Sequence, residues 1–192
     1  MPSISAIFDD HLKAVQALRE QEAEIRELGD LLVDCLRRGN RIFLCGNGGS
    51  AADAQHIAAE MVCRFEAQRR ALPAIALTTD TSALTAIGND FGYERVFARQ
   101  IEALARPGDL LIGISTSGNS GNVIAAVEQA NEMGVITLGL LGGSADNSGG
   151  RLLDLATHTL VVPSAITART QECHILIGHI WCGMIDAAFA EN

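Results

Sequence analysis

The first forty residues carry apolar side chains at the three- and four-residue intervals of an α-helix. One set consists of Ile7, Phe8, Leu12, Val15 and Leu18. A second set continues from Ile25 to Leu36, and Gly39-Asn40 then provides a helix stop. The spacing predicts helix over residues 3–38. One long helix and two helices that meet near residues 20–23 fit the pattern equally well.

From residue 41 the pattern changes to short apolar runs that alternate with helical stretches. The runs are 41–45, 74–78, 110–115, 135–141 and 159–162. The helical stretches are 51–65, 82–87, 94–105, 121–133 and 169–189. Each run is too short for a buried helix and is typical of a buried strand. The alternation predicts an α/β fold, with a doubly wound, parallel, five-stranded sheet of the flavodoxin-like kind flanked by helices.

The chain is therefore expected to form a single domain over residues 1–192. Residues 41–192 would be its α/β core, and residues 1–40 would be an N-terminal helical extension. The extension is amphipathic and has no obvious partner within such a core. Burial against another subunit would cover its apolar face, so we expect it to serve in oligomerisation. Folding back onto its own domain is the alternative.

Composition narrows the class of protein. The net charge of -9 argues against general binding of nucleic acid, which needs lysine and arginine to neutralise phosphates. Lys13 is the only lysine and no P-loop is present, which excludes P-loop ATP hydrolysis and disfavours lysine-based covalent catalysis. The five cysteines are irregularly spaced without a Cys-x-x-Cys, which favours reduced thiols in a cytoplasmic protein. No apolar stretch is long enough for a transmembrane helix, so no membrane association is expected.

Two loops have the features of anion-binding turns. Residues 45–50 read Cys-Gly-Asn-Gly-Gly-Ser, and residues 115–120 read Ser-Thr-Ser-Gly-Asn-Ser. Each follows a predicted strand and opens a predicted helix, where free N–H groups and the positive end of the helix dipole favour an anion. Hydroxyl donors without lysine or arginine suit a sugar phosphate. Ala51 stands where a dinucleotide-binding fingerprint needs its third glycine, so an NAD site is a poor interpretation.

Candidate proton-transfer and metal-binding groups lie on two predicted helices. His56 and Glu60 are four residues apart and share one helical face. The last helix carries four more polar groups among apolar neighbours: Gln171, Glu172, His174 and His179. A lone histidine on such a helix is more often a hydrogen-bonded core residue, but four polar groups in nine positions favour a site. Histidine, glutamate and a glutamine oxygen are plausible zinc ligands, although their spacing alone is a weak signal.

Beside a sugar phosphate, a carboxylate and a histidine can move a proton between adjacent carbons. One group removes the proton next to the carbonyl and the other helps to return it, through an enediol. A metal could polarise the two oxygens.

Several motifs together resemble the phosphoheptose isomerases of the sugar-isomerase (SIS) domain superfamily. They are Gly46-Asn47-Gly48-Gly49-Ser50, Ala54-Gln55-His56, Gly88-Asn89-Asp90-Phe91-Gly92, the run from Gly113 to Ser120, and Gln171-Glu172-x-His174. They occur in order between about residues 5 and 188. The resemblance implies an aldose–ketose isomerase that converts sedoheptulose 7-phosphate to D-glycero-D-manno-heptose 7-phosphate. This reaction leads to the heptoses of bacterial surface glycans such as lipopolysaccharide.

The resemblance also implies roles for individual residues. Glu60 would be the general base and His179 its acid/base partner. Zinc, one ion per subunit, would be held by His56, Glu60, Gln171 and His179. The substrate would contact Asn47, Gly48, Gly49, Ser50, Glu60, Asn89, Asp90, Ser115, Thr116, Ser117, Ser120 and Gln171, with the serine-rich loop on its phosphate. The family implies a homotetramer with active sites at its subunit interfaces.

One departure from the family and two rival functions bear on this interpretation. Some members carry Asp-Arg-Ile-Gln-Glu where this chain has Ala168-Arg169-Thr170-Gln171-Glu172, so an acidic side chain is missing.

The same superfamily includes non-catalytic tetramers that bind the replication initiator protein, and these also resemble the chain. Glu60 and His179 favour the isomerase, because an adaptor has no chemical need for them. A sensor for another sugar phosphate is the second rival, and a fused DNA-binding or kinase domain would identify it.

Overall fold

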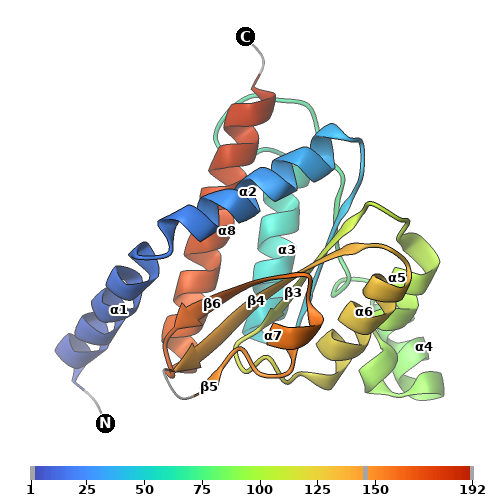
Figure 1. Ribbon diagram of the computed structural model, residues 1–192. Helices are drawn as coiled ribbons and strands as arrows, with labels where there is room; N and C mark the ends of the chain where they lie inside the picture. Colours follow the sequence, from blue (N-terminus) through green and yellow to red (C-terminus); the bar gives the residue numbers. More distant parts are fainter. Residues whose placement is uncertain (1–2, 145–146, 191–192) are drawn as a thin grey trace.

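A computed structural model describes residues 3–144 and 147–190 of the chain (Figure 1). The strands are β1 (Ile42–Gly46), β2 (Ala74–Ala76), β3 (Leu110–Ser115), β4 (Ile136–Ser144), β5 (Asn147–Ser148) and β6 (His158–Pro163). The α-helices are α1 (Ile4–Arg19), α2 (Glu22–Arg37), α3 (Gly49–Val62), α4 (Thr81–Phe91), α5 (Ala98–Leu104), α6 (Gly121–Glu132), α7 (Leu152–Leu155) and α8 (Thr167–Phe189). A 3₁₀ turn, η1, spans Tyr93–Arg95.

The five predicted strands form a parallel sheet, in the order β2-β1-β3-β4-β6. The prediction of a five-stranded parallel sheet is thus confirmed. The two-residue strand β5, which the pattern did not predict, pairs antiparallel with the end of β4. The order of strands along the chain reverses at β1, which has β2 on one side and β3 on the other. In doubly wound sheets, ligands bind beyond the strand ends at such a reversal.

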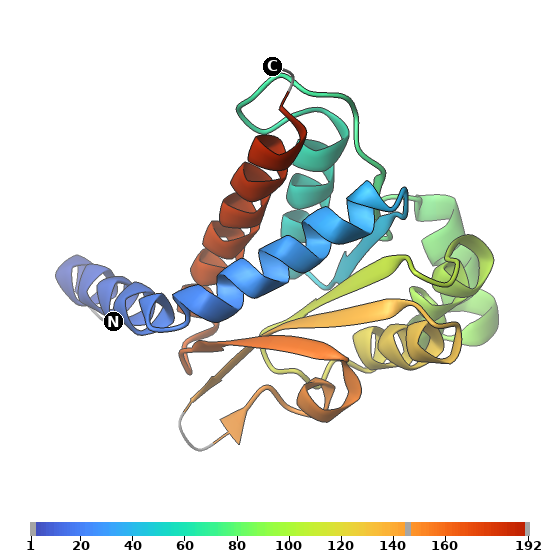
Figure 2. The same ribbon diagram turned by 45° about the horizontal axis from the view of Figure 1, so that its top comes forward.

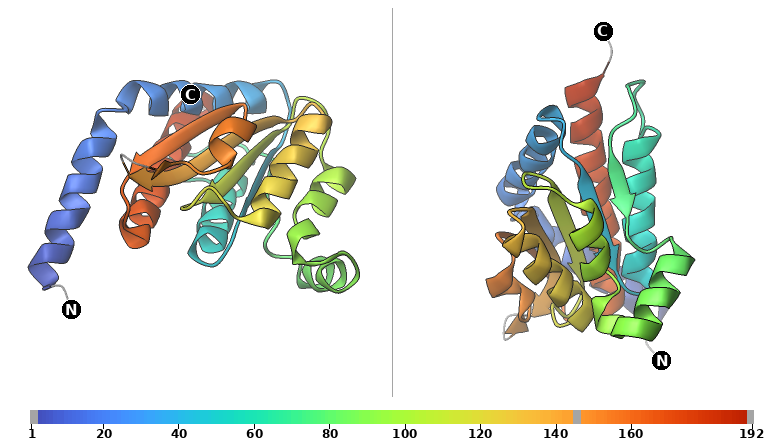
Figure 3. Two further views of the ribbon diagram at one scale, coloured as in Figure 1. Left: turned by 60° about the horizontal axis from the view of Figure 1, so that its bottom comes forward. Right: turned by 90° about the vertical axis from the view of Figure 1, so that its right-hand side faces the viewer.

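Helices cover both faces of the sheet, as Figure 3 shows from two sides. Alternate residues of β1 point to opposite faces, so Leu44 joins a core with α2, α3 and α8, while Phe43 joins a core with α5, α6 and α7. Trp181 of α8 is fully buried, and its indole N–H donates to the carbonyl of Ile25 in α2 at 2.9 Å. The two cores therefore hold the sheet from either side and fix α3, α6 and α8 relative to it.

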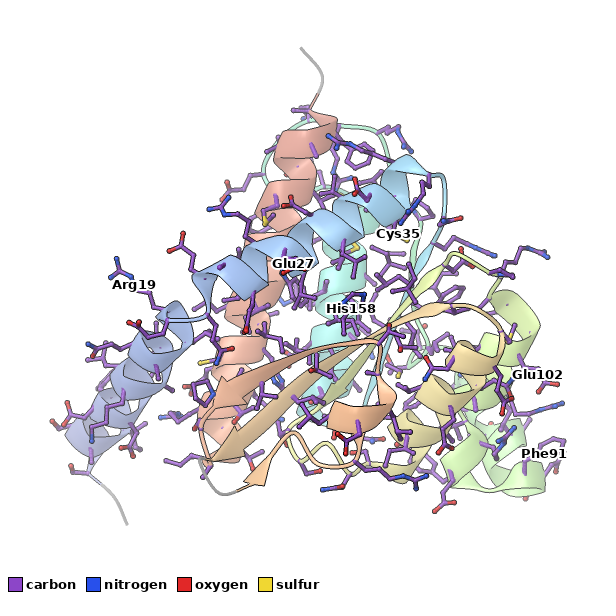
Figure 4. All side chains as sticks on the ribbon, in the orientation of Figure 1. Arg19, Glu27, Cys35, Phe91, Glu102 and His158 are labelled. Carbon is purple, nitrogen blue, oxygen red and sulfur yellow. The ribbon has the colours of Figure 1, made fainter. Side chains whose placement is uncertain are left out.

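The N-terminal segment is two helices, which decides between the two predicted alternatives. The break falls at residues 20–21, where the Gln21 side chain donates to the carbonyl of Val161 on β6 at 3.1 Å. Helix α2 packs onto the sheet, whereas α1 projects from the body of the molecule (Figure 2). Figure 4 places Arg19 at the junction and Cys35 on the sheet side of α2. Four apolar residues of α1 are exposed: Ile4, Ile7, Phe8 and Leu12.

The helices differ from the prediction in several places. The stretch 94–105 is divided into η1 and α5, and α4 continues to Phe91, further than the predicted 82–87. The four-residue helix α7 was not predicted. Helix α8 begins at Thr167, so Ala168 and Thr170 lie inside its first turn and not ahead of it. Among the described residues, no helix is long and apolar enough to cross a membrane.

Candidate functional site

The two predicted anion-binding loops lie side by side at the reversal point of the sheet. The first loop follows β1 and leads into α3, and the second follows β3 and leads into α6. Because β1 and β3 are parallel neighbours, their carboxyl ends reach the same edge of the sheet. Helices α3 and α6 then leave along opposite faces, so both helix N-termini point toward one crevice.

Glycine is required in the first loop by both conformation and close approach. Gly48, the N-cap of α3, has a φ of 55°, and no side chain caps the helix there. A Cβ at Gly49 would lie 2.7 Å from the Gln171 side-chain nitrogen. The amide of Gln171 therefore lies against the start of α3, and a larger residue at position 49 would displace it. Ser50 is buried, at 4% exposure.

The second loop presents hydroxyl groups around the start of α6. The hydroxyls of Ser115 and Ser120 share a hydrogen bond at 3.0 Å, and the Ser117 hydroxyl accepts one from the Asn119 backbone N–H at 3.2 Å. Ser120 is the N-cap of α6, but its side chain makes no capping hydrogen bond. Thr116 and Ser117 line a polar pocket of about 270 Å³, together with the ends of β4 and β6 and the start of α8. An uncapped helix N-terminus beside hydroxyl donors can bind an anion.

A pair of asparagine amides ties the two loops together. Asn47 and Asn122 exchange hydrogen bonds, each side-chain nitrogen donating to the other's oxygen at 2.8 Å. The Asn47 side chain is thus committed to the protein, and its predicted contact with substrate falls to its backbone. Asn122, which is buried at 4% exposure, was not among the predicted site residues. Its position in the first turn of α6, amid apolar neighbours, was the available signal.

His56, Glu60 and His179 converge, although they come from two helices. His56 Nε2 lies 3.3 Å from Glu60 Oε1 and 3.4 Å from His179 Nε2. The ring of Phe65 stacks on His179, with centroids 5.3 Å apart. The pairing of His56 and Glu60 follows from their i, i+4 spacing, whereas the approach of His179 depends on the packing of α8 against α3. The side chains of His56 and Glu60 are partly exposed, at 47% and 25%, so a substrate can reach them.

The donor chemistry of this cluster fits zinc. Ligand atoms held at about 2.1 Å in a tetrahedron lie about 3.4 Å from one another, close to the two separations around His56 Nε2. Gln171 offers an amide oxygen from α8. Nevertheless, the described residues contain no group of three or more His, Cys, Asp or Glu side chains already arranged to hold a metal ion. The ligand set therefore remains a prediction.

Two further candidates on α8 do not join the cluster. Glu172 accepts hydrogen bonds from Arg169 and from His11 of α1, the latter at 2.7 Å. His174 is fully buried and bonds through Nε2 to the Leu141 carbonyl at 2.9 Å. Burial lowers the pKa of His174 to about 4, so this histidine is neutral and anchors α8 to β4.

Asn89 and Asp90 lie at the end of α4, a helix without a buried residue. The Asn89 amide donates to Asp90 at 2.7 Å. Within the described part of the chain, neither side chain bonds to another predicted site residue. Tyr93, in the 3₁₀ turn that follows α4, donates its hydroxyl to the Asn47 side-chain oxygen at 3.5 Å. The predicted contact of Asn89 and Asp90 with substrate therefore stays a prediction.

Known proteins resemble this chain over nearly its whole length. The SIS domain family model matches residues 8–142. The phosphoheptose isomerase of Nitratiruptor sp. is 55% identical over 94% of this chain and 95% of its own length. Phosphoheptose isomerase 1 of Campylobacter jejuni is 54% identical, with 95% and 96% covered.

Two solved structures of phosphoheptose isomerases also resemble this chain. The phosphoheptose isomerase structure from Neisseria gonorrhoeae matches with a TM-score of 0.89 at 45% identity, covering 96% of this chain and 97% of that one. The structure from Francisella tularensis matches with a TM-score of 0.91 at 37% identity, covering 96% of each chain.

Proposed function

The chain belongs to the phosphoheptose isomerase family of SIS-domain proteins, and we propose that its site converts sedoheptulose 7-phosphate to D-glycero-D-manno-heptose 7-phosphate. The observation that carries the proposal is the approach of Glu60 and His179 to His56, on and beside a helix that begins at a crevice suited to an anion. A carboxylate and an imidazole next to a sugar-phosphate site are the groups that an aldose–ketose isomerisation needs.

Glu60 is the general base of the proposed reaction. Its carboxylate removes a proton from C1 of the ketose, and the carbonyl oxygen on C2 takes up a proton to give an enediol. The proton held by Glu60 returns to C2, while the hydroxyl on C1 loses its proton and becomes the aldehyde. His179 carries the proton between the two oxygens. The exchange balances without an external oxidant or reductant.

The two loops hold the substrate in this proposal. The hydroxyl groups of the second loop bind the phosphate at the N-terminus of α6: Ser115, Thr116, Ser117 and Ser120. The backbone of the first loop contacts the sugar chain through Asn47, Gly48 and Gly49, and Ser50 follows them in the first turn of α3. The Gln171 side chain lies against Gly49 at the start of α3. His56, Glu60, Gln171 and His179 would hold zinc. When bound there, zinc supplies Lewis-acid polarisation of the two substrate oxygens.

The oligomeric state of the enzyme, its location and the use of its product are also part of the proposal. The exposed apolar residues of α1 support burial against other copies of the chain, and we infer a homotetramer with active sites at its interfaces. The cysteine pattern and the substrate class support a cytoplasmic enzyme that supplies heptose for lipopolysaccharide and related surface glycans.

The non-catalytic adaptor gains no support from the relatives named above, each of which is an isomerase by name. The sensor alternative rests on fold alone, since the structure of the Vibrio vulnificus NanR protein complexed with ManNAc-6P matches at only 16% identity.

A single assay tests the function and the metal together. The protein is stripped with a chelator, incubated with or without zinc, and given sedoheptulose 7-phosphate, and the aldose phosphate is measured. We expect product only after zinc is restored. Product without zinc would contradict the metal proposal and keep the isomerase. No product in either arm, from folded protein, would contradict the isomerase.

A further inference from the structure

A buried ion pair joins the end of α3 to α8, outside the residues placed in the reaction above. Arg69 Nε donates to Asp186 Oδ1 at 2.7 Å, and the two side chains are 1% and 4% exposed. The other oxygen of Asp186 accepts the backbone N–H groups of Glu66 and Ala67, each at 2.7 Å. Burial acts to raise the pKa of Asp186, but these hydrogen bonds outweigh it and hold the pKa below its usual value. Asp186 is therefore a charged carboxylate inside the protein.

The guanidinium of Arg69 is bonded to the backbone of the helix that carries the general base. Its Nη2 donates to the carbonyl of Glu60 itself at 2.7 Å, and its Nη1 donates to the carbonyl of Met61 at 2.9 Å. Nη1 also donates to the carbonyl of Arg70 at 3.0 Å. The bonds to Glu60 and Met61 satisfy carbonyls at the end of α3 that have no partner within the helix, and a cation there is favoured by the helix dipole. With its donors committed in this way, Arg69 has little left to offer a substrate.

Asp186 lies on the same face of α8 as His179. The two residues are seven apart, which is about two turns of helix. The segment that Asp186 holds, residues 66–67, directly follows Phe65, whose ring stacks on His179. One ion pair thus connects the backbone of Glu60, the helix of His179 and the ring that packs on His179.

We propose that Arg69 and Asp186 are positioning residues that set the distance between the Glu60 carboxylate and the His179 imidazole for proton transfer. The inference rests on the proposed isomerase function. A displacement of about 1 Å in a reacting group can reduce turnover about 100-fold while substrate binding is kept. The pair is therefore expected to affect kcat and to leave KM nearly unchanged. Lysine cannot replace Arg69, because one ammonium cannot bridge a carboxylate and several carbonyls in a plane.

The chain offers a matched control in Asp109, whose bonds go to residues outside α3 and α8. Asp109 is also a buried carboxylate in an ion pair, 3.0 Å from Arg41, and it accepts two backbone N–H groups, from Arg41 and Arg106, at 2.9 Å each. It directly precedes β3, and the bonds just described tie it to the segments that lead into β1 and β3, not to the helices that carry Glu60 and His179. Removing the charge of either aspartate should lower stability, and more so for Asp186, because Arg69 is 1% exposed and Arg41 is 29% exposed. Only one of the two should alter catalysis.

The test compares Asp186→Asn with Asp109→Asn, both assayed well below their unfolding temperatures. We expect Asp186→Asn to lower kcat by about 10- to 100-fold with KM within about threefold, and Asp109→Asn to keep both values. Unchanged kcat in folded Asp186→Asn, or an equal fall in both variants, would overturn the proposal. If Asp186→Asn does not fold, Arg69→Lys takes its place with the same expectations.

A second readout does not depend on turnover. In ¹H–¹⁵N spectra of the histidine rings, Asp186→Asn should move the signals of His56 and His179, whereas Asp109→Asn should leave them in place. Unmoved signals would overturn the positioning role even if the wild-type protein proved inactive. An inactive wild type with moved signals would instead contradict only the isomerase function.

Discussion

The two predicted anion-binding loops have the same backbone arrangement but lead into helices of different character. Both follow a parallel strand and open a helix whose N-terminus no side chain caps. The helix after the first loop, α3, carries partly exposed His56 and Glu60. The helix after the second, α6, has Val123 and Val127 fully buried on its inner face. One loop thus leads into reactive groups, and the other only offers donors to an anion.

The difference lies in what each helix packs against. Helix α3 lies beside α8, which brings His179 to His56 across a helix–helix contact. Helix α6 packs against α5 and β3, and the residues that it buries there join an apolar core. The proposed mechanism therefore assigns proton transfer to the helix after the first loop and phosphate binding to the second loop. Variants on each side should have different kinetic signatures.

The largest expected effect is on the chemistry side. Glu60→Gln removes the base and keeps the shape, so kcat should fall by about 10³-fold while the protein stays folded. Steady-state kinetics with sedoheptulose 7-phosphate measure kcat, and a thermal melt checks that the protein is folded. Glu102→Gln, on the surface of α5 (Figure 4), is the control and should behave as wild type. Full activity of Glu60→Gln would remove Glu60 from the base role.

The next effect concerns His179, which we place in both proton transfer and zinc binding. His179→Asn should lower kcat by about 100-fold and reduce the zinc bound per subunit. Metal analysis after dialysis against trace zinc measures the zinc bound per subunit. His158→Asn, at the amino end of β6, should retain both activity and metal. Unchanged zinc content in His179→Asn would exclude ligation by that residue.

A smaller effect is expected on the binding side. Ser120→Ala removes one hydroxyl from the start of α6 and should raise KM about tenfold, with little change in kcat. Ser50→Ala in the first loop should change KM less, because the Ser50 side chain is already buried. Competitive inhibition by inorganic phosphate should weaken in Ser120→Ala only. Equal effects of the two substitutions would show that both loops bind the phosphate.

Local patterns predicted the elements and one half of the site. Alternating runs and glycine loops were enough for the five parallel strands, and i, i+4 spacing was enough to pair His56 with Glu60. What the pattern could not supply depends on packing over long sequence distances. The Asn47–Asn122 pair and the contact of His179 with His56 join residues 75 and 123 positions apart. Likewise, nothing local separates His174 from His179, because burial depends on which face of α8 meets β4.

Because His174 is buried and His179 lies at the site, a substitution of His174 should have the smallest effect on catalysis and a clear effect on stability. His174 is neutral when folded, with its pKa lowered to about 4, whereas in the unfolded chain its pKa returns to the ordinary value of 6.5. The unfolded state therefore holds more protons between these values, so stability is complete above pH 6.5 and is lost as pH falls toward 4. Between pH 7 and pH 5 this one group should lower the free energy of unfolding by about 2 kcal/mol.

His174→Gln keeps a donor for the Leu141 carbonyl but cannot take up the proton. Urea unfolding at pH 7 and pH 5 should thus show a smaller loss in this variant than in wild type, while kcat at pH 7 stays the same. His158→Gln should preserve the wild-type loss. A large fall of kcat in folded His174→Gln would place His174 with the reactive histidines, and the contrast between the two faces of α8 would then be wrong.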